Sequence, residues 1–343
     1  MRSIPLALSA LILACSSNQG APAQDAAAPD VVTNDAAPPN DASDASAAAL
    51  TSVIALDGSA YELAEGLAVR DGKAYVGLAP TGTILQIDSS GKRTDYGHVP
   101  AGGSDGYTLG LVFDAQGDLF VLETLNVPDA GAPVPGVYEL PPGGGTSMAP
   151  FATDANFGFP NGGAFDAHGN LLVADSATGR VLSVTPAGVV STWKADDTLA
   201  GSTACNAPLP FPIGANGIVL TPSAAYVTNT SKGSIVKIDV DGNGDAGAAT
   251  TIVADCQYAG FDGIALDSDG TLLAAINGSP GKLARVTTSG AVTVLASSAP
   301  LDGPASVAFV DGWNGGRYAL VTNSAFFDTS SPKPGLLAYG PLP

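Results

Sequence analysis

The chain has 343 residues, with 13 basic and 32 acidic residues and a formal net charge of −19. Such a negative charge repels the phosphates of a nucleic acid, so we expect no nucleic-acid partner. With 43 glycines, 26 prolines and only 13% charged residues, the composition favours many short strands and tight turns over long helices. The presence of only two histidines argues against a histidine-based zinc site.

The N-terminus has the pattern of an export signal. Arg2 precedes an apolar stretch at residues 4–13, and the run Leu-Ile-Leu-Ala-Cys ending at Cys15 resembles a bacterial lipobox. We therefore expect residues 1–15 to be a signal peptide, with lipidation at Cys15 as the only attachment to a membrane. The protein would then be a lipoprotein in the periplasm or at the cell surface, and the alternative is cleavage and free secretion.

Residues 16–50 differ in composition from the rest of the chain. They contain five aspartates among alanine, proline, serine and asparagine, and they contain no lysine, arginine or aromatic residue. Such a segment buries too little apolar area to offset the entropy of ordering it. We predict a disordered linker here and a folded domain at residues 51–343, which we expect to be monomeric.

From residue 65 onward one pattern recurs six times. A glycine begins each repeat, followed by an apolar strand, a turn rich in aspartate and glycine such as "DAQGD" or "DAHGN", and further apolar strands. The starts lie 40 to 55 residues apart, a spacing typical of one four-stranded propeller blade. The sequence predicts an all-β, six-bladed β-propeller whose blades start at Gly66, Gly110, Gly162, Gly217, Gly263 and Gly303.

The sixth repeat lacks a fourth strand of its own. The segment "SVIAL" at residues 52–56 precedes the first repeat and has the apolar character of a strand. If it pairs with the last repeat, it closes the ring and covers an open sheet edge. We therefore predict closure of the propeller by an N-terminal strand.

The residue before each starting glycine indicates a site, because equivalent positions of successive blades meet at one end of the central channel. These residues are Glu65, Leu109, Asn161, Asn216, Asp262 and Asp302. The residues from blades one, three, four and five supply two carboxylates and two amides. Oxygen ligands of this mixture suit Ca²⁺. An Asx-Gly pair is also an ordinary turn signal, so each pair taken alone has a purely structural interpretation.

The segments "EGLAV", "PNGGAFD", "ANGIVL" and "FDGIALD" resemble the metal-bearing blade starts of the gluconolactonase/regucalcin (senescence marker protein) family. The resemblance covers residues 52–340. It implies that Glu65, Asn161, Asn216 and Asp262 bind one Ca²⁺ or another divalent cation. It also implies that Asp262 is the general base in hydrolysis of a lactone or ester, whose carbonyl the cation polarises.

One departure from the family pattern concerns the substrate. Phe159 stands two residues before Asn161, where gluconolactonase-like members carry an arginine that helps to hold a sugar acid. We therefore expect a less polar substrate, or none. The alternative function is a non-catalytic cell-surface propeller with a structural cation, and a weaker one is a lyase or synthase like the strictosidine-synthase-like relatives.

The run "IDVDGNGDAG" has the alternate oxygen residues of an EF-hand loop. Thr250 stands at the twelfth position, where an EF-hand has glutamate, so we favour an acidic hairpin tip over a second Ca²⁺ site. The aspartates and asparagine of this run are Asp239, Asp241, Asn243 and Asp245.

Two cysteines remain in the predicted domain. Cys205 and Cys256 lie in the loops that enter blades four and five, which should be neighbours. In an exported protein they favour a disulfide, with two free thiols as the alternative.

The remaining polar residues are weaker candidates for a functional role. We expect His168 to be exposed in a turn and His98 to lie in a channel-side loop. Glu123 and Asp175 end strands, where we expect structural hydrogen bonds or exposure. Asp302 is a candidate extension of the channel site, and residues 97–108 and 193–213 are predicted loops over the channel.

Overall fold

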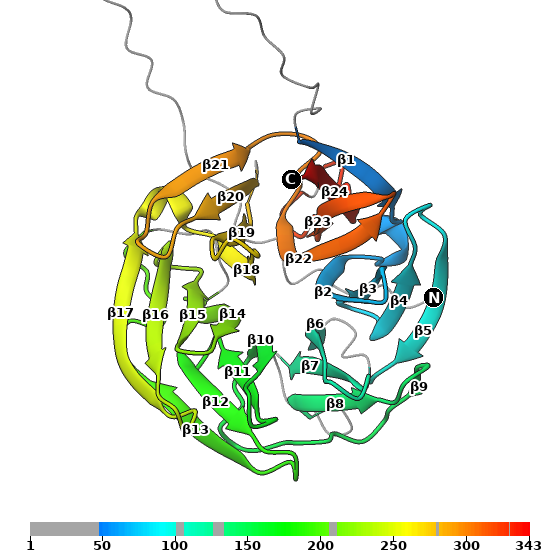
Figure 1. Cartoon of the computed structure of the whole chain (residues 1–343). Helices are drawn as coiled ribbons and strands as arrows, with labels where there is room; N and C mark the ends of the chain where they lie inside the picture. Colours follow the sequence, from blue (N-terminus) through cyan, green and yellow to red (C-terminus); the bar gives the residue numbers. More distant parts are fainter. Residues whose placement is uncertain (1–47, 101–105, 126–133, 206–210, 279–280, 329) are drawn as a thin grey trace, which may run out of the picture. The chain divides into compact units, whose positions relative to one another are not determined.

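We describe the protein from a computed structural model, in which residues 48–100, 106–125, 134–205, 211–278, 281–328 and 330–343 are described. Within these ranges, no helix has the length and apolar character needed to cross a membrane. The described part is almost entirely β-structure, arranged as six small sheets in a ring (Figure 1).

Each blade is an antiparallel sheet whose first strand lies nearest the centre of the ring (Figure 1). Blade one contains β2 (Ala64–Arg70), β3 (Lys73–Leu78), β4 (Thr83–Ile87) and β5 (Arg93–His98). Blade two contains β6 (Gly106–Phe113), β7 (Leu119–Leu125) and β8 (Gly136–Leu140). Blade three contains β10 (Pro160–Phe165), β11 (Leu171–Asp175), β12 (Arg180–Val184) and β13 (Val190–Ala195).

Blade four contains β14 (Ala215–Thr221), β15 (Ala224–Asn229), β16 (Ser234–Val240) and β17 (Ala246–Ala254). Blade five contains β18 (Phe261–Leu266), β19 (Leu272–Ile276), β20 (Lys282–Val286) and β21 (Val292–Ala296). Blade six contains β22 (Pro304–Trp313), β23 (Gly316–Asn323), β24 (Gly335–Leu342) and β1 (Ala49–Ala55). Two short 3₁₀ turns, η1 (Gly58–Ala60) and η2 (Cys256–Tyr258), lie in the connections.

The hydrophobic core lies between the blades. Successive side chains of a strand point to opposite faces of its sheet, and in a propeller both faces pack against a neighbouring blade. Val121 accordingly packs with residues of blade one, whereas Leu122, the next residue, packs with residues of blade three. This double burial explains why the inner strands are apolar throughout.

Blade two departs from the four-stranded pattern. Among its described residues the sheet has three strands, and a single bridge from Val137 to Ala152 occupies the place of a fourth. The short strand β9 (Gly145–Thr146) pairs instead in parallel with β5, which makes the sheet of blade one five-stranded.

An N-terminal strand closes the ring, as the sequence predicts. Strand β1 pairs antiparallel with β24 from Ala49↔Gly340 to Ala55↔Gly335 and is the outermost strand of blade six. It begins two residues before the predicted start of the domain at residue 51. Because the two ends of the domain share one sheet, blade six has no open outer edge at β24.

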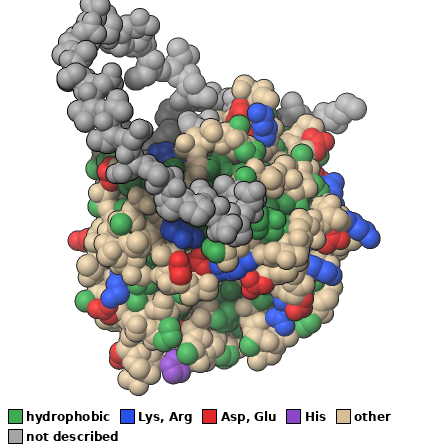
Figure 2. All heavy atoms as spheres, turned by 45° about the horizontal axis from the view of Figure 1, so that its top comes forward, with side chains coloured by type: hydrophobic (Ala, Val, Ile, Leu, Met, Phe, Trp, Pro, Cys, Tyr) green, Lys and Arg blue, Asp and Glu red, His purple; other side chains and the backbone are tan. Residues whose placement is uncertain are grey.

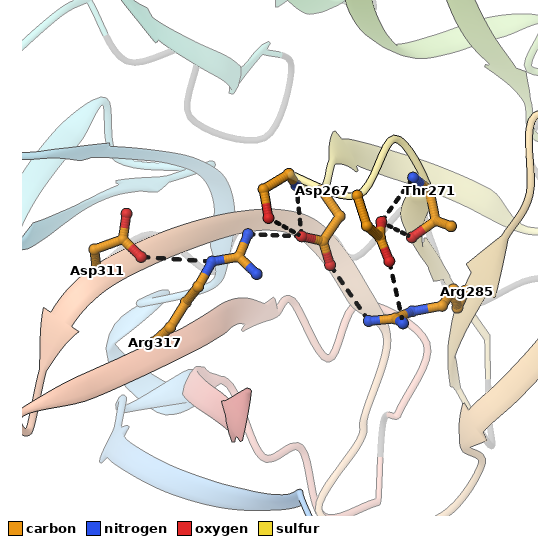
Figure 3. A network of polar contacts seen from close by, with 7 residues as sticks. Asp267, Thr271, Arg285, Asp311 and Arg317 are labelled. Atoms are coloured by element: carbon orange, nitrogen blue, oxygen red, sulfur yellow. Dashed lines mark hydrogen bonds and ion pairs between the residues drawn. The ribbon is translucent and has the colours of Figure 1, made fainter. Parts of the chain in front are cut away.

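A charged network joins blades five and six at the ends of their inner strands (Figure 3). The buried Asp267 carboxylate accepts hydrogen bonds from Arg317 at 2.7 Å and from Arg285 at 3.3 Å. Arg317 also pairs with Asp311 at 3.4 Å. On the face of the molecule shown in Figure 2, acidic and basic side chains are interspersed.

Candidate metal centre

Each inner strand has an irregularity of pairing near its start. In blade one the ladder passes from Ala64↔Leu78 to Leu67↔Val76, so Glu65 and Gly66 lie in a β-bulge. The same shift follows Thr108, Pro160, Ala215, Phe261 and Pro304 in the other blades. Bulges redirect side chains out of the regular pleat and are common beside active sites. Here the bulge carries the predicted ligand of blades one, three, four and five.

In blades one to five, the glycine of the bulge is required by close packing of the inner strands. A Cβ atom on Gly66 would lie 1.9 Å from the carbonyl oxygen of Leu109, and one on Gly162 would lie 2.3 Å from that of Asn216. One on Gly217 would lie 2.5 Å from the carbonyl oxygen of Asp262. The bulges of neighbouring blades are therefore in backbone contact around the axis. We call the set Glu65, Asn161, Asn216 and Asp262 the axial site.

The register corrects the predicted start of blade six. Pro304↔Asn323 and Val307↔Val321 flank its bulge, so Ala305 and Ser306 occupy the places of the ligand and the glycine. A Cβ atom on Gly263 would indeed lie 2.7 Å from the carbonyl oxygen of Ala305. Asp302 is therefore not at the equivalent position. It accepts a hydrogen bond from the backbone N–H of Lys333 at 2.8 Å, so it fastens a loop.

Two hydroxyl groups determine how the ligand amides are oriented. The Ser176 hydroxyl donates to the carbonyl oxygen of Ala215 at 2.7 Å, so the 3.3 Å contact between Asn161 and Ser176 is donated by Asn161 Nδ2. In the next blade Thr230 donates to the carbonyl oxygen of Phe261 at 2.7 Å and accepts from Asn216 Nδ2 at 2.8 Å. Because a hydroxyl has one proton, these contacts fix which end of each amide is nitrogen. The Oδ1 atoms are left as acceptors.

The two carboxyl groups of the axial site are buried and influence each other. Glu65 is 7% exposed and its Oε2 has no hydrogen-bond partner. Burial, and next the charge of Asp262, raises the pKa of Glu65 well above its usual range. Burial also raises the pKa of Asp262, against hydrogen bonds from Asn277 and Asn216. Two such groups are hard to ionise together without a compensating cation.

These residues fit a divalent cation of the Ca²⁺ type. The donors are all oxygens, one carboxylate oxygen is buried without a partner, and the buried Oδ1 of the adjacent Asn277 is also unpartnered. In the described part of the chain no group of three or more His, Cys, Asp or Glu residues is arranged so that it could hold a metal ion, so the amides are essential to any such site.

The surroundings of the axial site are apolar on one side. Leu109 and Ala305 occupy the bulges on either side of Glu65. Phe159 packs edge-on against Phe211 with ring centroids 5.2 Å apart. Tyr107, which precedes Leu109 as Phe159 precedes Asn161, packs against Phe326 at 6.0 Å.

Sequence reasoning did not identify the positioning residues Ser176, Thr230 and Asn277. Asn277 donates a hydrogen bond to Asp262 Oδ2 at 3.0 Å and so holds this carboxylate. The hydroxyls of Ser176 and Thr230 hold the two ligand amides in the same way. All three follow the end of a second strand, immediately after Asp175, Asn229 and Ile276. A polar residue at this place in successive repeats is a signal that could have identified them.

The other candidates lie away from the axial site. His98 ends the outer strand β5 and is exposed, so the expected channel-side location is wrong. His168 is exposed in a turn, as expected. Asp175 accepts hydrogen bonds from the backbone N–H groups of Gly158 and Phe159 and holds the loop that enters blade three.

Glu123 forms a structural hydrogen bond within its sheet, the first of the two expectations for this residue. It is fully buried and accepts a hydrogen bond from the Thr108 hydroxyl at 2.7 Å. Burial raises its pKa to about 8, and that hydrogen bond opposes the rise.

The aspartate-rich run of blade four forms a hairpin tip between β16 and β17. Asp241 Oδ1 accepts the backbone N–H groups of Asn243 and Asp245, and Thr250 lies within β17. Of the predicted loops over the channel, residues 97–98, 106–108 and 193–195 are strand, and residues 101–105 and 206–210 lie outside the described residues.

Cys205 and Cys256 form a disulfide, with a Cα–Cα distance of 5.1 Å. It joins the loops that enter blades four and five. Cys15, the predicted signal peptide and the predicted linker up to residue 47 lie outside the described residues.

Comparison with known proteins agrees with this architecture. Residues 211–324, about a third of the chain, match the family described as the SMP-30/gluconolactonase/LRE-like region, which confirms the resemblance seen in the blade starts. This segment contains Asn216 and Asp262. Among curated proteins no significant sequence match was found.

Several solved structures share the fold. The calcium-binding protein regucalcin from Agrobacterium tumefaciens is 17% identical with a TM-score of 0.59, covering 81% of this chain and 90% of its own. A gluconolactonase from Xanthomonas campestris is 15% identical with a TM-score of 0.59, covering 86% and 90%. A luciferin-regenerating enzyme is 15% identical with a TM-score of 0.60, covering 86% and 96%. At these identities the likeness establishes the six-bladed propeller fold alone.

Proposed function

We propose that this protein is a divalent-cation-dependent hydrolase of lactones or esters, with Ca²⁺ as the preferred ion. The observation that carries the proposal is the fixed orientation of the Asn161 and Asn216 amides beside two buried carboxyl groups. An ordinary turn does not require an asparagine to be held by a buried hydroxyl. The match of residues 211–324 to a gluconolactonase-containing family supports the same reaction class.

Glu65, Asn161, Asn216 and Asp262 would hold the ion, which supplies Lewis acidity toward the acyl carbonyl of the substrate. Asp262 is the candidate general base because it is the axial carboxylate with a partner, Asn277, that fixes its direction. Water loses a proton to Asp262 as its oxygen bonds to the acyl carbon. The acyl C–O bond then breaks, and the same proton passes to the leaving alkoxide, giving a hydroxy acid from a lactone or an acid and an alcohol from an ester.

The substrate we propose is apolar or aromatic near its acyl group. Leu109 and Ala305 offer no hydrogen bonds from their side chains, and the pair of Phe159 and Phe211 replaces the arginine expected for a sugar acid. A polyhydroxylated lactone would lose hydration at such a surface without replacement. We therefore expect an aromatic lactone to be hydrolysed faster than a sugar lactone.

Calcium titration by calorimetry after chelator treatment tests the metal centre, with Asp262→Asn and the exposed-residue control Asp95→Asn. We expect one ion to bind the wild type and the control equally, and at least a hundredfold weaker binding to Asp262→Asn. Hydrolysis should disappear on chelation and return with Ca²⁺. Binding without hydrolysis of any lactone or ester would instead support a binding propeller with a structural cation, and absence of binding would refute the metal centre.

We also propose that the protein is exported and anchored through Cys15. The Cys205–Cys256 disulfide supports an oxidising compartment, because such bonds persist outside the cytosol. Labelling cells with a palmitate analogue tests the anchor. Label that is present in the wild type and lost in Cys15→Ala is expected, and an unlabelled wild type would leave free secretion as the alternative.

A further inference from the structure

A cleft of about 560 Å³ lies between blades two and three. Its walls include the turns that follow the inner strands β6 and β10, so it lies at the opposite end of these strands from the axial site. Such a volume is in the range of small-molecule sites. The side chains on which the argument depends are Asp114, Phe120, Glu139, Phe151, Phe165 and His168.

Aromatic rings form the apolar wall of the cleft. The ring of Phe120 packs edge-on against Phe151 at 5.2 Å and against Phe165 at 5.1 Å. The interface between blades one and two has the same ring arrangement, because Tyr75 packs edge-on against Tyr96 at 4.8 Å and Phe113 at 4.7 Å.

At the interface between blades one and two, a guanidinium of the chain itself covers the aromatic rings. Arg70 lies over the Phe113 ring at 5.4 Å and donates to the backbone carbonyl of Asp114 at 3.0 Å. Phe113 and Phe165 are equivalent, since each lies four residues after the bulge residue of its inner strand. One aromatic wall is thus covered by an arginine.

The interface between blades five and six repeats this use of an arginine and adds a carboxylate, that of Asp267, to which Arg317 is joined in Figure 3. Arg317 lies over the Phe309 ring at 4.8 Å and donates to Asp267 at 2.7 Å. Phe309 is four residues after the bulge residue Ala305, and Asp267 is five residues after Asp262. These are the positions of Phe165 and Asp114 in blades three and two.

The cleft between blades two and three therefore has both halves of this arrangement and lacks the guanidinium. No lysine or arginine is among the described residues that line it. Arg317 lies two residues before Ala319, the strand partner of Phe309. The residue two before Leu171, the strand partner of Phe165, is Gly169, which has no side chain. Glu139 adds a second carboxylate at the position that Arg285 has in blade five.

We propose that this cleft binds an organic cation of the guanidinium or ammonium type, with its charge between Asp114 and Glu139 and its apolar part against Phe120 and Phe165. Cations bind the faces of aromatic rings, and carboxylates strengthen the contact. Arg70 and Arg317 show that this fold accommodates a guanidinium over an aromatic ring between blades, and Arg317 is also bound to a carboxylate there. The proposal does not depend on the axial site.

The electrostatics of the cleft agree with a cationic occupant. Burial, and next the charges of Asp118 and Asp114, raise the pKa of Glu139, so its neighbours disfavour its negative charge. Asp114 Oδ1 accepts the N–H groups of Gly117 and Asp118, and these backbone contacts do not neutralise the charge of the cleft. His168 lies at the exposed rim.

Calorimetric titration of the purified protein with benzylguanidinium tests the proposal, with neutral benzylurea as the isosteric control. We expect benzylguanidinium to bind and benzylurea to bind at least tenfold more weakly. Phe165→Leu copies the leucine that blades four and five have at this position, and Glu139→Gln copies Gln86 of blade one. Each should weaken benzylguanidinium binding by about tenfold.

Two further variants show whether binding is confined to this cleft. Asp95→Asn removes an exposed charge elsewhere and should leave binding unchanged. Asp262→Asn should also leave it unchanged, so failure of the axial metal centre and failure of the cleft are distinguishable. Equal binding of benzylurea, unchanged binding in both Phe165→Leu and Glu139→Gln, or no binding at millimolar concentration would overturn the proposal.

Discussion

Replacing Thr230 with valine tests whether a buried hydroxyl positions a metal ligand. The substitution keeps the shape of the side chain but removes the acceptor for Asn216 Nδ2 at 2.8 Å and the donor to the carbonyl of Phe261 at 2.7 Å. Thr230 is 3% exposed, so water cannot replace these contacts freely. Leaving buried polar partners unsatisfied costs about 1–3 kcal/mol of folding stability. The freed amide can also turn away from the axis, which we expect to weaken Ca²⁺ affinity by about 10–100-fold.

The assay compares Ca²⁺ affinity and the free energy of unfolding in matched variants. Thr230→Ser keeps the hydroxyl and should retain most of the affinity. Thr124→Val changes the equivalent position of blade two, where the hydroxyl has no partner and the bulge residue is Leu109 rather than an amide. It should leave affinity unchanged and stability equal or higher, since it removes an unsatisfied buried group. Unchanged affinity in Thr230→Val, or an equal loss in Thr124→Val, would refute the positioning role.

Three further perturbations address the rest of the propeller. The pKa of Glu123 is raised to about 8, above its unfolded value, so the folded state of the wild type should lose a few kcal/mol of stability as pH rises from about 4.5 to 8. In denaturant titrations Glu123→Gln should show a flatter dependence of stability on pH. Parallel pH profiles of wild type and variant would contradict this. Asp267→Ala removes the acceptor of two arginines and should lower the free energy of unfolding by about 2–3 kcal/mol. The loss is smaller than for fully buried ion pairs because Arg285 and Arg317 are partly exposed. An unchanged unfolding midpoint would show that the network contributes little. Deleting β1 (Ala49–Ala55) exposes the edge of β24 and should lower the melting temperature of the whole domain in a single transition; unaltered melting would mean that closure does not limit stability.

The repeat of glycine-led apolar strands was enough to predict the fold. Its spacing of 40 to 55 residues and the lone strand before the first repeat predicted six blades and their closure. The three-stranded form of blade two could not be predicted, because the pairing of β9 with β5 depends on where the connection from β8 to β10 contacts blade one. The predicted start of blade six is three residues too early, at Asp302 instead of Ala305. Its Gly303 lies before the strand, and the bulge that defines the blade start is visible only as a change of register at Ala305.

The sequence by itself determined which residue types stand at the starts of blades one to five, and hence the oxygen-only donor set of Glu65, Asn161, Asn216 and Asp262. Only the tertiary structure decided how those groups are held. Ser176 and Thr230 follow the ends of the second strands of their blades, 15 and 14 residues after the amides that they hold, and their protons go to the backbone of the next blade. The cleft between blades two and three was also decided by the tertiary structure, because the residues that line it come from two blades. Contacts between blades depend on packing of sheets distant in sequence, and no local propensity encodes them.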